Sequence, residues 1–285
     1  MLGTAQFMNN YGAVDSSPDS GPQQPERILE LAASYGLRRL DTAPAYGDAE
    51  TIIGDFRGTR FQVSTKLSSL VKNVDDAESW VIQEIEKSRL RLGGHGIARV
   101  LLHDPLGFFR DTFPKSQSIL QKVRDLLPGV AIGASLYSPD DWADIHKLAE
   151  LDLIQIPMSP FDQRFFNSGV LEMASSSGVK VQARSIFLQG ILIAPNHRLP
   201  IYFDRWRSLM RDWNEFCSNQ LITAAEICYN HAAASEFVDE VVVGVKSTTE
   251  LEQIFNAATA SPKLVNAEGW ASDDLDLIDP RRWAI

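Results

Sequence analysis

Groups that can bind or transfer protons stand at the ends of short apolar runs of the chain. Asp41, Lys66 and His103 each end such a run, and Tyr46 follows soon after Asp41. A carboxylate, an ammonium, an imidazole and a phenol are groups that proteins use in general acid–base chemistry. Because an unpaired buried charge costs several kcal/mol, an Asp, a Lys and a His at buried strand ends indicate a shared site.

Each of these residues also has an ordinary structural explanation. A lysine at the end of a strand is most often a surface residue, a lone histidine is most often structural, and an aspartate before a threonine can cap a helix. These explanations hold for each residue taken alone. Their occurrence on three consecutive strand ends favours one site built from all of them.

The apolar runs alternate with amphipathic stretches along the whole chain. Eight runs carry apolar residues at mostly consecutive positions, which is typical of strands buried on both faces of a parallel sheet. The predicted strands are Leu2–Phe7, Arg38–Thr42, Phe61–Lys66, Arg99–His103, Val130–Ser135, Leu153–Pro157, Val179–Arg184 and Val241–Val245.

Helix signals lie between these runs. Asp75-Asp76-Ala77-Glu78 and Ser247-Thr248-Thr249-Glu250 resemble capping boxes, Pro25 suits the first turn of a helix, and Gly93-Gly94 suits a helix end. The segment Asp15–Gln24, rich in Ser, Pro, Gly and Asp, is predicted to be one surface loop.

Eight strand–helix units in about 260 residues predict a (β/α)₈ TIM barrel. A doubly wound open sheet is the main alternative, but no Gly-x-Gly-x-x-Gly follows the first predicted strand. The units use nearly all of the chain. We therefore expect a single barrel domain over residues 1–285, with a C-terminal tail from about residue 261.

Composition restricts the class of protein. The chain is 44% hydrophobic and 22% charged, which is close to the globular average and argues against disorder. No apolar run approaches the roughly 20 residues of a membrane span, and the N-terminus lacks the pattern of a signal peptide. Two cysteines, Cys217 and Cys228, cannot make a disulfide framework, so we expect a cytoplasmic protein. The net charge of −10 argues against nucleic acid as a partner.

The polar strand ends also carry a resemblance. Asp41-Thr42-Ala43-Pro44-Ala45-Tyr46-Gly47, followed closely by Glu50, resembles the signature of the aldo-keto reductase family. Ser64-Thr65-Lys66 and Leu101-Leu102-His103-Asp104-Pro105 are similar to its lysine and histidine strands, and Leu2–Phe7 is similar to its opening strand. The resemblance extends to about Ala258.

The resemblance implies an NAD(P)H-dependent oxidoreductase that reduces an aldehyde or ketone to an alcohol. Tyr46 would donate the proton to the carbonyl oxygen, although an isolated phenol with a pKa of about 10 is a poor donor at neutral pH. Lys66 would stabilise the phenolate, and Asp41 would hold Lys66 in place. His103 would hydrogen-bond the carbonyl oxygen and orient it.

The resemblance further implies a dinucleotide lying across the strand ends, with no metal. Ser135 and Gln155 would hold the carboxamide, and the loop 185–190 would wrap the pyrophosphate. The adenosine end would meet the start of the last helix, although simple capping explains Ser247 equally well. The implied cofactor-binding residues are Gly3, Thr4, Ser135, Gln155, Arg184, Ser185, Phe187, Gln189, Gly190, Lys246 and Ser247.

Three positions depart from the family pattern. Leu136 replaces an asparagine that contacts the carboxamide, and Arg184 replaces an aromatic residue that stacks on the nicotinamide. Glu250 stands where an arginine often binds the 2′-phosphate of NADPH, although Lys246 could compensate. We expect NADPH as the cofactor, with NADH as the alternative.

Specificity and closure of the barrel are less strongly indicated. The segment Arg184–Gly190 resembles a bacterial branch associated with sugar metabolism, so a sugar-like or small aldehyde substrate is expected. Because the first strand begins at Leu2, the hairpin that plugs many family barrels has no room, and side chains or the tail should close the bottom. Aromatic residues that could wall a pocket, or pack on the barrel, are Phe108, Phe109, Phe113, Tyr202, Phe203, Trp206, Trp270 and Trp283.

Two other classes of function stay open at this point. One is a non-catalytic cofactor-binding or regulatory protein on the same fold. The other is a metal-dependent barrel hydrolase, for which only His103 among the five histidines is well placed. The sequence gives no indication of the oligomeric state.

Overall fold

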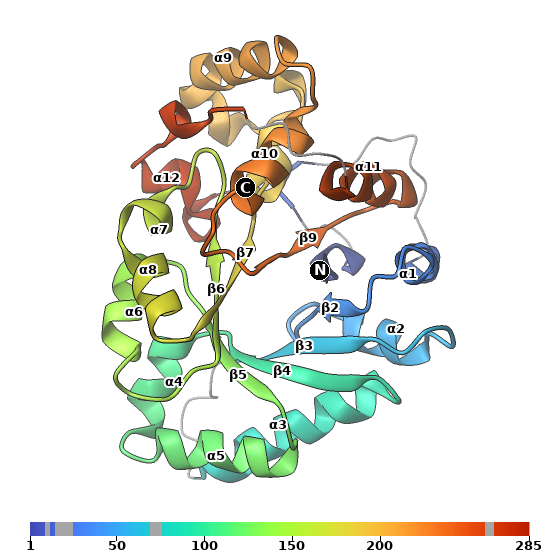
Figure 1. The fold of residues 1–285 in the computed structure, drawn as a ribbon, viewed down its shortest axis with the longest axis vertical. Coiled ribbons are helices and arrows are strands. Elements are labelled where there is room, and N and C mark those ends of the chain that lie inside the picture. The colour runs from blue at the N-terminus through green and yellow to red at the C-terminus, as the bar shows by residue number, and fades with distance from the viewer. Residues whose placement is uncertain (9–11, 15–24, 69–75, 260–264, 285) are drawn as a thin grey trace.

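The computed structural model describes the whole chain except residues 9–11, 15–24, 69–75, 260–264 and 285. Nine parallel strands follow one another in the order β8-β7-β6-β5-β4-β3-β2-β1-β9 (Figure 1). The strands are β1 (Leu2–Gly3), β2 (Arg39–Asp41), β3 (Gln62–Leu67), β4 (Gly96–Leu102), β5 (Ala131–Ser135), β6 (Leu153–Pro157), β7 (Lys180–Arg184), β8 (Glu240–Val241) and β9 (Val243–Gly244).

The two strands at the ends of this order are one segment of chain. The amide of Val242 donates to the carbonyl of Ala183 at 2.8 Å, on the β7 side. The amide of Val243 donates to the carbonyl of Met1 at 3.0 Å, on the β1 side. The last strand therefore changes partner at Val242 and closes the sheet, which confirms the predicted single-domain (β/α)₈ barrel.

Of the predicted strands, only Leu153–Pro157 has the observed bounds, and two of the differences lie beside the polar strand ends. β1 ends at Gly3, and the chain turns into a short 3₁₀ helix, Ala5–Phe7, so the predicted strand Leu2–Phe7 is too long. The turn begins at Thr4, whose amide and hydroxyl both donate to the carbonyl of Asp41. β4 ends one residue before His103, although the His103 amide still donates to the carbonyl of Leu67 at 3.0 Å.

Helices surround the barrel on its outside (Figure 1). They are α1 (Pro25–Ser34), α2 (Ala49–Asp55), α3 (Ala77–Leu92), α4 (Pro105–Thr112), α5 (Ser116–Leu126), α6 (Pro139–Ile145), α7 (Arg164–Asn167), α8 (Val170–Ser176), α9 (Arg207–Ser218), α10 (Ala224–Ala233), α11 (Thr248–Thr259) and α12 (Leu275–Ile278). Their apolar faces and the outward side chains of the strands form the main hydrophobic core.

Local chemistry explains where the helices begin. Pro25 starts α1 as predicted, and the side chain of Asp76 caps α3 by accepting from the amide of Ser79 at 3.0 Å. Ser247 caps α11 by accepting from the amide of Glu250 at 3.1 Å. The predicted loop Asp15–Gln24, the residue Asp75 and the predicted start of the tail at about residue 261 lie outside the described residues.

Charged side chains occupy the amino-terminal end of the barrel. Glu240 accepts from Arg39 at 2.5 Å and from Arg99 at 2.6 Å, and its side chain is only 11% exposed. The tail does not take this place, because Ala267, Trp270 and the segment 275–283 pack in a second cluster with side chains that follow β6 and β7. The sequence allowed the barrel bottom to be closed by side chains or by the tail, and in the structure side chains close it.

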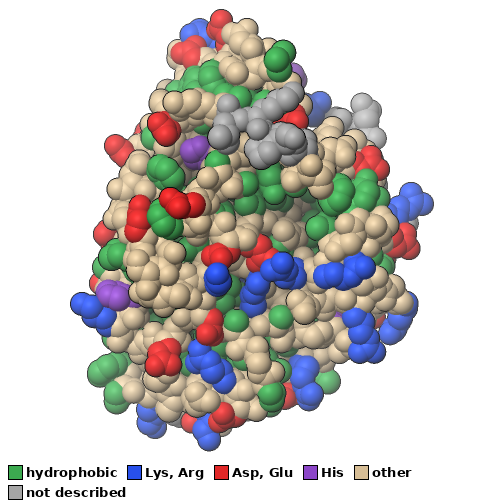
Figure 2. Space-filling view, viewed as in Figure 1, with side chains coloured by type: hydrophobic (Ala, Val, Ile, Leu, Met, Phe, Trp, Pro, Cys, Tyr) green, Lys and Arg blue, Asp and Glu red, His purple; other side chains and the backbone are tan. Residues whose placement is uncertain are grey.

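The surface carries both signs of charge. Figure 2 shows basic and acidic side chains interspersed on the displayed face. Cys217 and Cys228 are free and buried. Within the described ranges, no helix combines the length and apolarity needed to cross a lipid bilayer.

The contact between α2 and α3 gives a test of the fold. A methyl group added at Gly54 would collide with the backbone carbonyl of Arg91, which cannot move aside. We expect Gly54→Ala to lower the free energy of unfolding by about 1–3 kcal/mol, as overpacking does. Gly96→Ala is the control, because nothing lies near the added methyl. Urea unfolding of both variants measures the difference, and equal stabilities would contradict the packing described here.

Candidate active site

The central contact of the site is a buried ion pair. Lys66 on β3 places its Nζ 2.7 Å from Oδ1 of Asp41 on the neighbouring strand β2. Nζ also donates to the carbonyl of Thr42 at 3.1 Å. The two side chains are 1% and 5% exposed, so the pair is almost completely withdrawn from water.

The ion pair determines the charge state of Lys66. Burial alone would lower the pKa of its ammonium, but the Asp41 carboxylate and a hydrogen bond with Tyr46 act more strongly and raise the pKa above its ordinary value. The ammonium also lies 4.9 Å from the centroid of the Tyr46 ring. Lys66 is therefore a permanent cation beside the phenol.

His103 faces the same phenol from β4. Its ring meets the Tyr46 ring edge-on, with centroids 6.4 Å apart and planes at 88°. Burial, with Lys66 and Arg184 nearby, lowers the pKa of His103 to about 4. At neutral pH the imidazole is uncharged and carries one N–H that it can donate.

Glu50 ties the signature segment to the barrel wall. From α2, its buried carboxylate accepts from the hydroxyl of Thr65 at 2.5 Å and pairs with Arg91 at 2.7 Å. Thr65 is the neighbour of Lys66 on β3. Glu50 thus joins α2, α3 and the lysine strand behind the site rather than facing it.

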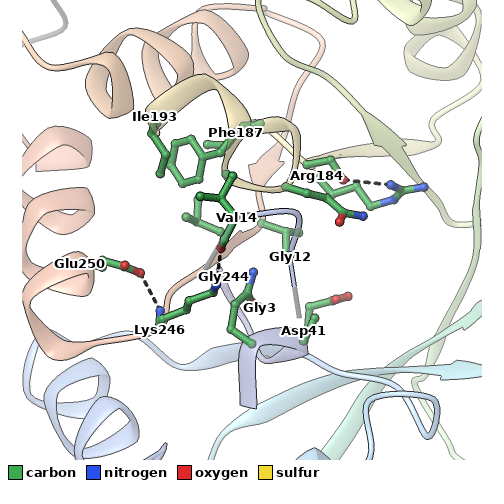
Figure 3. A pocket seen from close by; sticks show the side chains of 18 of the residues that line it. Gly3, Gly12, Val14, Asp41, Arg184, Phe187, Ile193, Gly244, Lys246 and Glu250 are labelled. Atoms are coloured by element: carbon green, nitrogen blue, oxygen red, sulfur yellow. Dashed lines mark hydrogen bonds between the residues drawn. The ribbon is translucent and has the colours of Figure 1, made fainter. Parts of the chain in front are cut away.

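The four residues adjoin a cavity of about 360 Å³ at the carboxyl ends of the strands. Asp41, Tyr46 and His103 line it, whereas Lys66 lies behind Asp41. The predicted cofactor-binding residues that line it are Gly3, Ser135, Gln155, Arg184, Ser185, Phe187, Gln189, Gly190 and Lys246 (Figure 3). Thr4 and Ser247 do not line it, because Thr4 binds the Asp41 carbonyl and Ser247 caps α11.

The loop after β7 has an unusual backbone on one side of the cavity. Ser185, Leu188 and Gln189 have φ values of 58°, 47° and 52°, and Gly190 has a φ of 95°. Non-glycine residues in this left-handed region are uncommon and gather at ligand sites. Tight turns hold the loop in this shape, because the amides of Leu188 and Gly190 donate to the carbonyls of Ser185 and Phe187 at 2.8 and 3.0 Å.

Lys246 crosses the other end of the cavity (Figure 3). Its Nζ donates to the carbonyl of Val14 at 3.0 Å, and its amide donates to Oε2 of Glu250 at 2.7 Å. The amide of Ala13 donates to the carbonyl of Gln189 at 3.2 Å. The segment 12–14 therefore bridges the β7 loop and the start of α11. No pattern in the sequence predicts this contact.

Arg184 is held in a defined place at the cavity wall. Its guanidinium donates to the carbonyl of Leu136 at 3.0 Å and to the hydroxyl of Ser185 at 3.1 Å. It also lies 4.3 Å from the ring centroid of Tyr137, and Arg281 lies 4.0 Å from the same centroid. Sequence reasoning missed Tyr137, which its place two residues after Ser135 could have suggested.

The aromatic residues that could wall a pocket or pack on the barrel lie away from the cavity. None of the eight aromatic residues proposed for the pocket lines the cavity. Phe108 and Phe109 belong to the main core, and Phe203, Trp270 and Trp283 belong to the second cluster, which the tail helps to form. The aromatic side chains of the cavity wall are Tyr46, Tyr137, Phe187 and the imidazole of His103.

Comparison with known proteins identifies the chain. Residues 1–268 match the Aldo/keto reductase family. The chain belongs to this family. It is 27% identical over 269 residues to a D-threo-aldose 1-dehydrogenase from Pseudomonas sp, covering 79% of this chain and 80% of that protein.

Solved structures show the same fold at low identity. The aldo-keto reductase AKR11C1 from Bacillus halodurans, in its holo form, has a TM-score of 0.73 and 18% identity, covering 94% of this chain and 88% of that one. The glycerol dehydrogenase AKR11B4 from Gluconobacter oxydans has a TM-score of 0.68 and 21% identity, covering 98% and 91%.

As a member of this family, the protein is an oxidoreductase of small carbonyl compounds. The family uses nicotinamide cofactors. One buried atom suits such a cofactor. Oε1 of Gln155 has no hydrogen-bond partner among the described residues, although Gln155 is 1% exposed and lines the cavity. A buried carbonyl without a partner fits a ligand that donates an N–H, as a carboxamide does.

A metal-dependent reaction would need a set of side chains that can hold a metal ion, and the part of the chain that the structure describes has none. No three His, Cys, Asp or Glu side chains there are grouped so as to hold a metal ion. His95, for example, accepts from the amide of Phe61 at 3.0 Å, in a structural role.

The low pKa of His103 gives a test by stability. The folded protein disfavours the charged imidazole, whose pKa in the unfolded chain is about 6.5. The contribution to stability is therefore complete above pH 6.5 and is lost as the pH falls towards 4. We expect the free energy of unfolding to fall by up to about 3 kcal/mol more in the wild type than in His103→Asn over this range. Urea titrations at each pH measure it, and parallel curves would contradict the buried neutral imidazole.

Proposed function

We propose that this aldo-keto reductase reduces an aldehyde or ketone to an alcohol, with a nicotinamide dinucleotide as hydride source and Tyr46 as proton donor. The observation that carries the proposal is the buried Asp41–Lys66 pair, which places a permanent cation against the Tyr46 phenol at the cavity. A cation in this position stabilises the phenolate that forms when the proton leaves.

Each of the four residues has a separate role in the proton transfer. The bound cofactor supplies a hydride to the carbonyl carbon. Tyr46 gives its proton to the carbonyl oxygen as negative charge develops there, and Lys66 stabilises the resulting phenolate. Neutral His103 donates its N–H to the same oxygen and orients it. Asp41 keeps the charge and position of Lys66 without itself touching the substrate.

The cavity wall supports the proposed placement of the cofactor. Oε1 of Gln155 and the hydroxyl of Ser135 would receive the carboxamide. Leu136 would add no contact, because its amide donates to the backbone carbonyl of Gln155 and its carbonyl accepts from Arg184. The loop 185–190, which lines the cavity, would lie along the pyrophosphate. Lys246 would meet the adenosine end.

A sugar-like substrate is the proposal that the relatives support. The curated relative is an aldose dehydrogenase, and one structural neighbour is a glycerol dehydrogenase, both named for polyhydroxylated compounds. The wall beside Tyr46 and His103 carries Arg184 and Tyr137, which can hydrogen-bond hydroxyl groups. The cytoplasmic location inferred from the sequence stays a prediction.

Tyr46→Phe tests the proton donor. The change removes one hydroxyl and leaves the ring beside Lys66, so the cofactor should bind with nearly unchanged affinity. We expect kcat to fall at least about 100-fold, the usual contribution of a positioned acid. Turnover of aldoses and small aldehydes measures kcat, and fluorescence quenching measures cofactor binding.

Near-normal turnover in Tyr46→Phe would rule out the assigned role. A wild-type protein that binds the cofactor but turns over no member of a broad carbonyl panel would instead support the non-catalytic alternative.

We further propose NADPH as the preferred cofactor. Glu250 lies at the cavity, but its carboxylate accepts from the amide of Lys246, while within the described ranges the Lys246 ammonium donates to one acceptor, the carbonyl of Val14. That leaves donors on the ammonium for a 2′-phosphate.

Lys246→Met tests this preference. We expect it to weaken NADPH binding about tenfold, the effect of one lost charge-assisted contact, and to leave NADH binding nearly unchanged. Titration of both cofactors against the wild type and the variant measures this. NADH binding as tight as NADPH binding in the wild type would overturn the preference.

A further inference from the structure

A chain of hydrogen bonds crosses the inside of the barrel beneath the cavity. Nε2 of Gln155 donates both to Oδ2 of Asp41 at 2.8 Å and to Oε1 of Gln182 at 3.3 Å. Nε2 of Gln182 in turn donates to Oε2 of Glu240 at 2.7 Å. The chain joins the catalytic ion pair to the charged cluster at the amino-terminal end of the barrel.

The strand register places these side chains together. Gln155 on β6 is paired with Gln182 on β7, and Gln182 is paired with Glu240 on β8. Paired residues of a parallel sheet present their side chains on the same face. Gln155 and Gln182 are each 1% exposed, so neither amide has water as an alternative partner.

The direction of every bond in the chain follows from its carboxylate ends. An ionised carboxylate only accepts, so Glu240 requires the N–H₂ of Gln182 to face it. The carbonyl of Gln182 then faces Gln155 and requires an N–H from it. Asp41 requires the other N–H of Gln155. Both hydrogens of the Gln155 amide are thereby used, and Oε1 is left without a partner.

We propose that Gln182 and Glu240 are positioning residues for the cofactor. Neither Gln182 nor Glu240 is among the described residues that line the cavity. They lock the Gln155 amide so that its N–H₂ serves Asp41 and its carbonyl stays available to an N–H donor in the cavity. Arg39 and Arg99 hold the Glu240 end of the chain through ion pairs of 2.5 and 2.6 Å. This inference rests on the proposed function, because the donor would be the carboxamide of the nicotinamide.

The test compares two dinucleotides that differ in this donor. NADP⁺ carries a carboxamide, whereas 3-acetylpyridine adenine dinucleotide phosphate carries a methyl ketone with no N–H. Gln182→Met keeps the size of the side chain and removes both hydrogen bonds. We expect it to weaken NADP⁺ binding about five- to tenfold, as loss of a well-placed hydrogen bond does, and to change binding of the analogue less than about twofold. Isothermal titration calorimetry measures both affinities without turnover.

Four further variants make the result specific. Gln155→Leu should cause the same selective loss, and the double variant with Gln182→Met should add little to it, because both act on one contact. Ser64→Ala is the control inside the barrel: Ser64 is 2% exposed, and it should leave both affinities unchanged. Glu240→Met, which removes the acceptor of the Gln182 amide, serves as the second positioning variant if Gln182→Met does not fold, with the same selective loss expected.

The outcomes separate this inference from the proposed function. A selective loss of NADP⁺ affinity in Gln182→Met supports the positioning role. An equal loss for both dinucleotides, or no loss, overturns it while leaving the proposed function standing. A wild-type protein that binds neither dinucleotide overturns both.

Discussion

The structure depends on the need to bury an ammonium. An unpaired lysine side chain in the interior of a barrel would lose its proton or destabilise the fold by several kcal/mol. Lys66 avoids this because its ammonium donates hydrogen bonds to the Asp41 carboxylate on the adjacent strand, at 2.7 Å, and to the carbonyl of Thr42. The pairing of β2 with β3 is therefore what makes a permanent cation available to Tyr46.

Asp41 in turn needs partners, and the barrel supplies them from several strands. Its carbonyl receives the amide and hydroxyl of Thr4, and its second carboxylate oxygen receives Gln155 from across the barrel. The outer layer of the barrel is apolar and packs against helices, whereas the inner layer near the cavity is a hydrogen-bonded network. The two layers have different tasks: the outer one holds the strands together, and the inner one fixes the orientation of a few side chains.

The sequence predicted the parts of the site that follow from local pattern. Asp41, Lys66 and His103 end apolar runs, and parallel strands bring such ends to one rim, so their assembly could be foreseen from the chain alone. Ser247 caps α11, as its local pattern allowed, whereas nothing in the pattern around Thr4 shows that its hydroxyl donates to the carbonyl of Asp41 on another strand. The sequence left open whether the tail closes the barrel bottom. The stacking of Trp270 on Phe161, which places the tail elsewhere, joins segments more than 100 residues apart and leaves no local signal.

The inner network escaped prediction for a related reason. Gln182 and Glu240 lie within predicted strands or at their edge, where one polar residue in an apolar run carries no local signal. Their meaning comes from the register of β6, β7 and β8 and from the distance across the barrel to β2, which depend on closure of the whole sheet. Tyr137 and Arg198 at the cavity wall likewise depend on how their loops fold.

The directed chain from Glu240 to Asp41 also constrains how this barrel can change over evolutionary time. Replacing one amide or carboxylate leaves its neighbour with a buried group that has nothing to bond. Acceptable sequences are therefore those that alter positions 155, 182 and 240 together, either as another matched set of donors and acceptors or as an apolar set. Divergence within this lineage should proceed in concerted steps along the inside of the barrel, while the outer layer drifts one residue at a time.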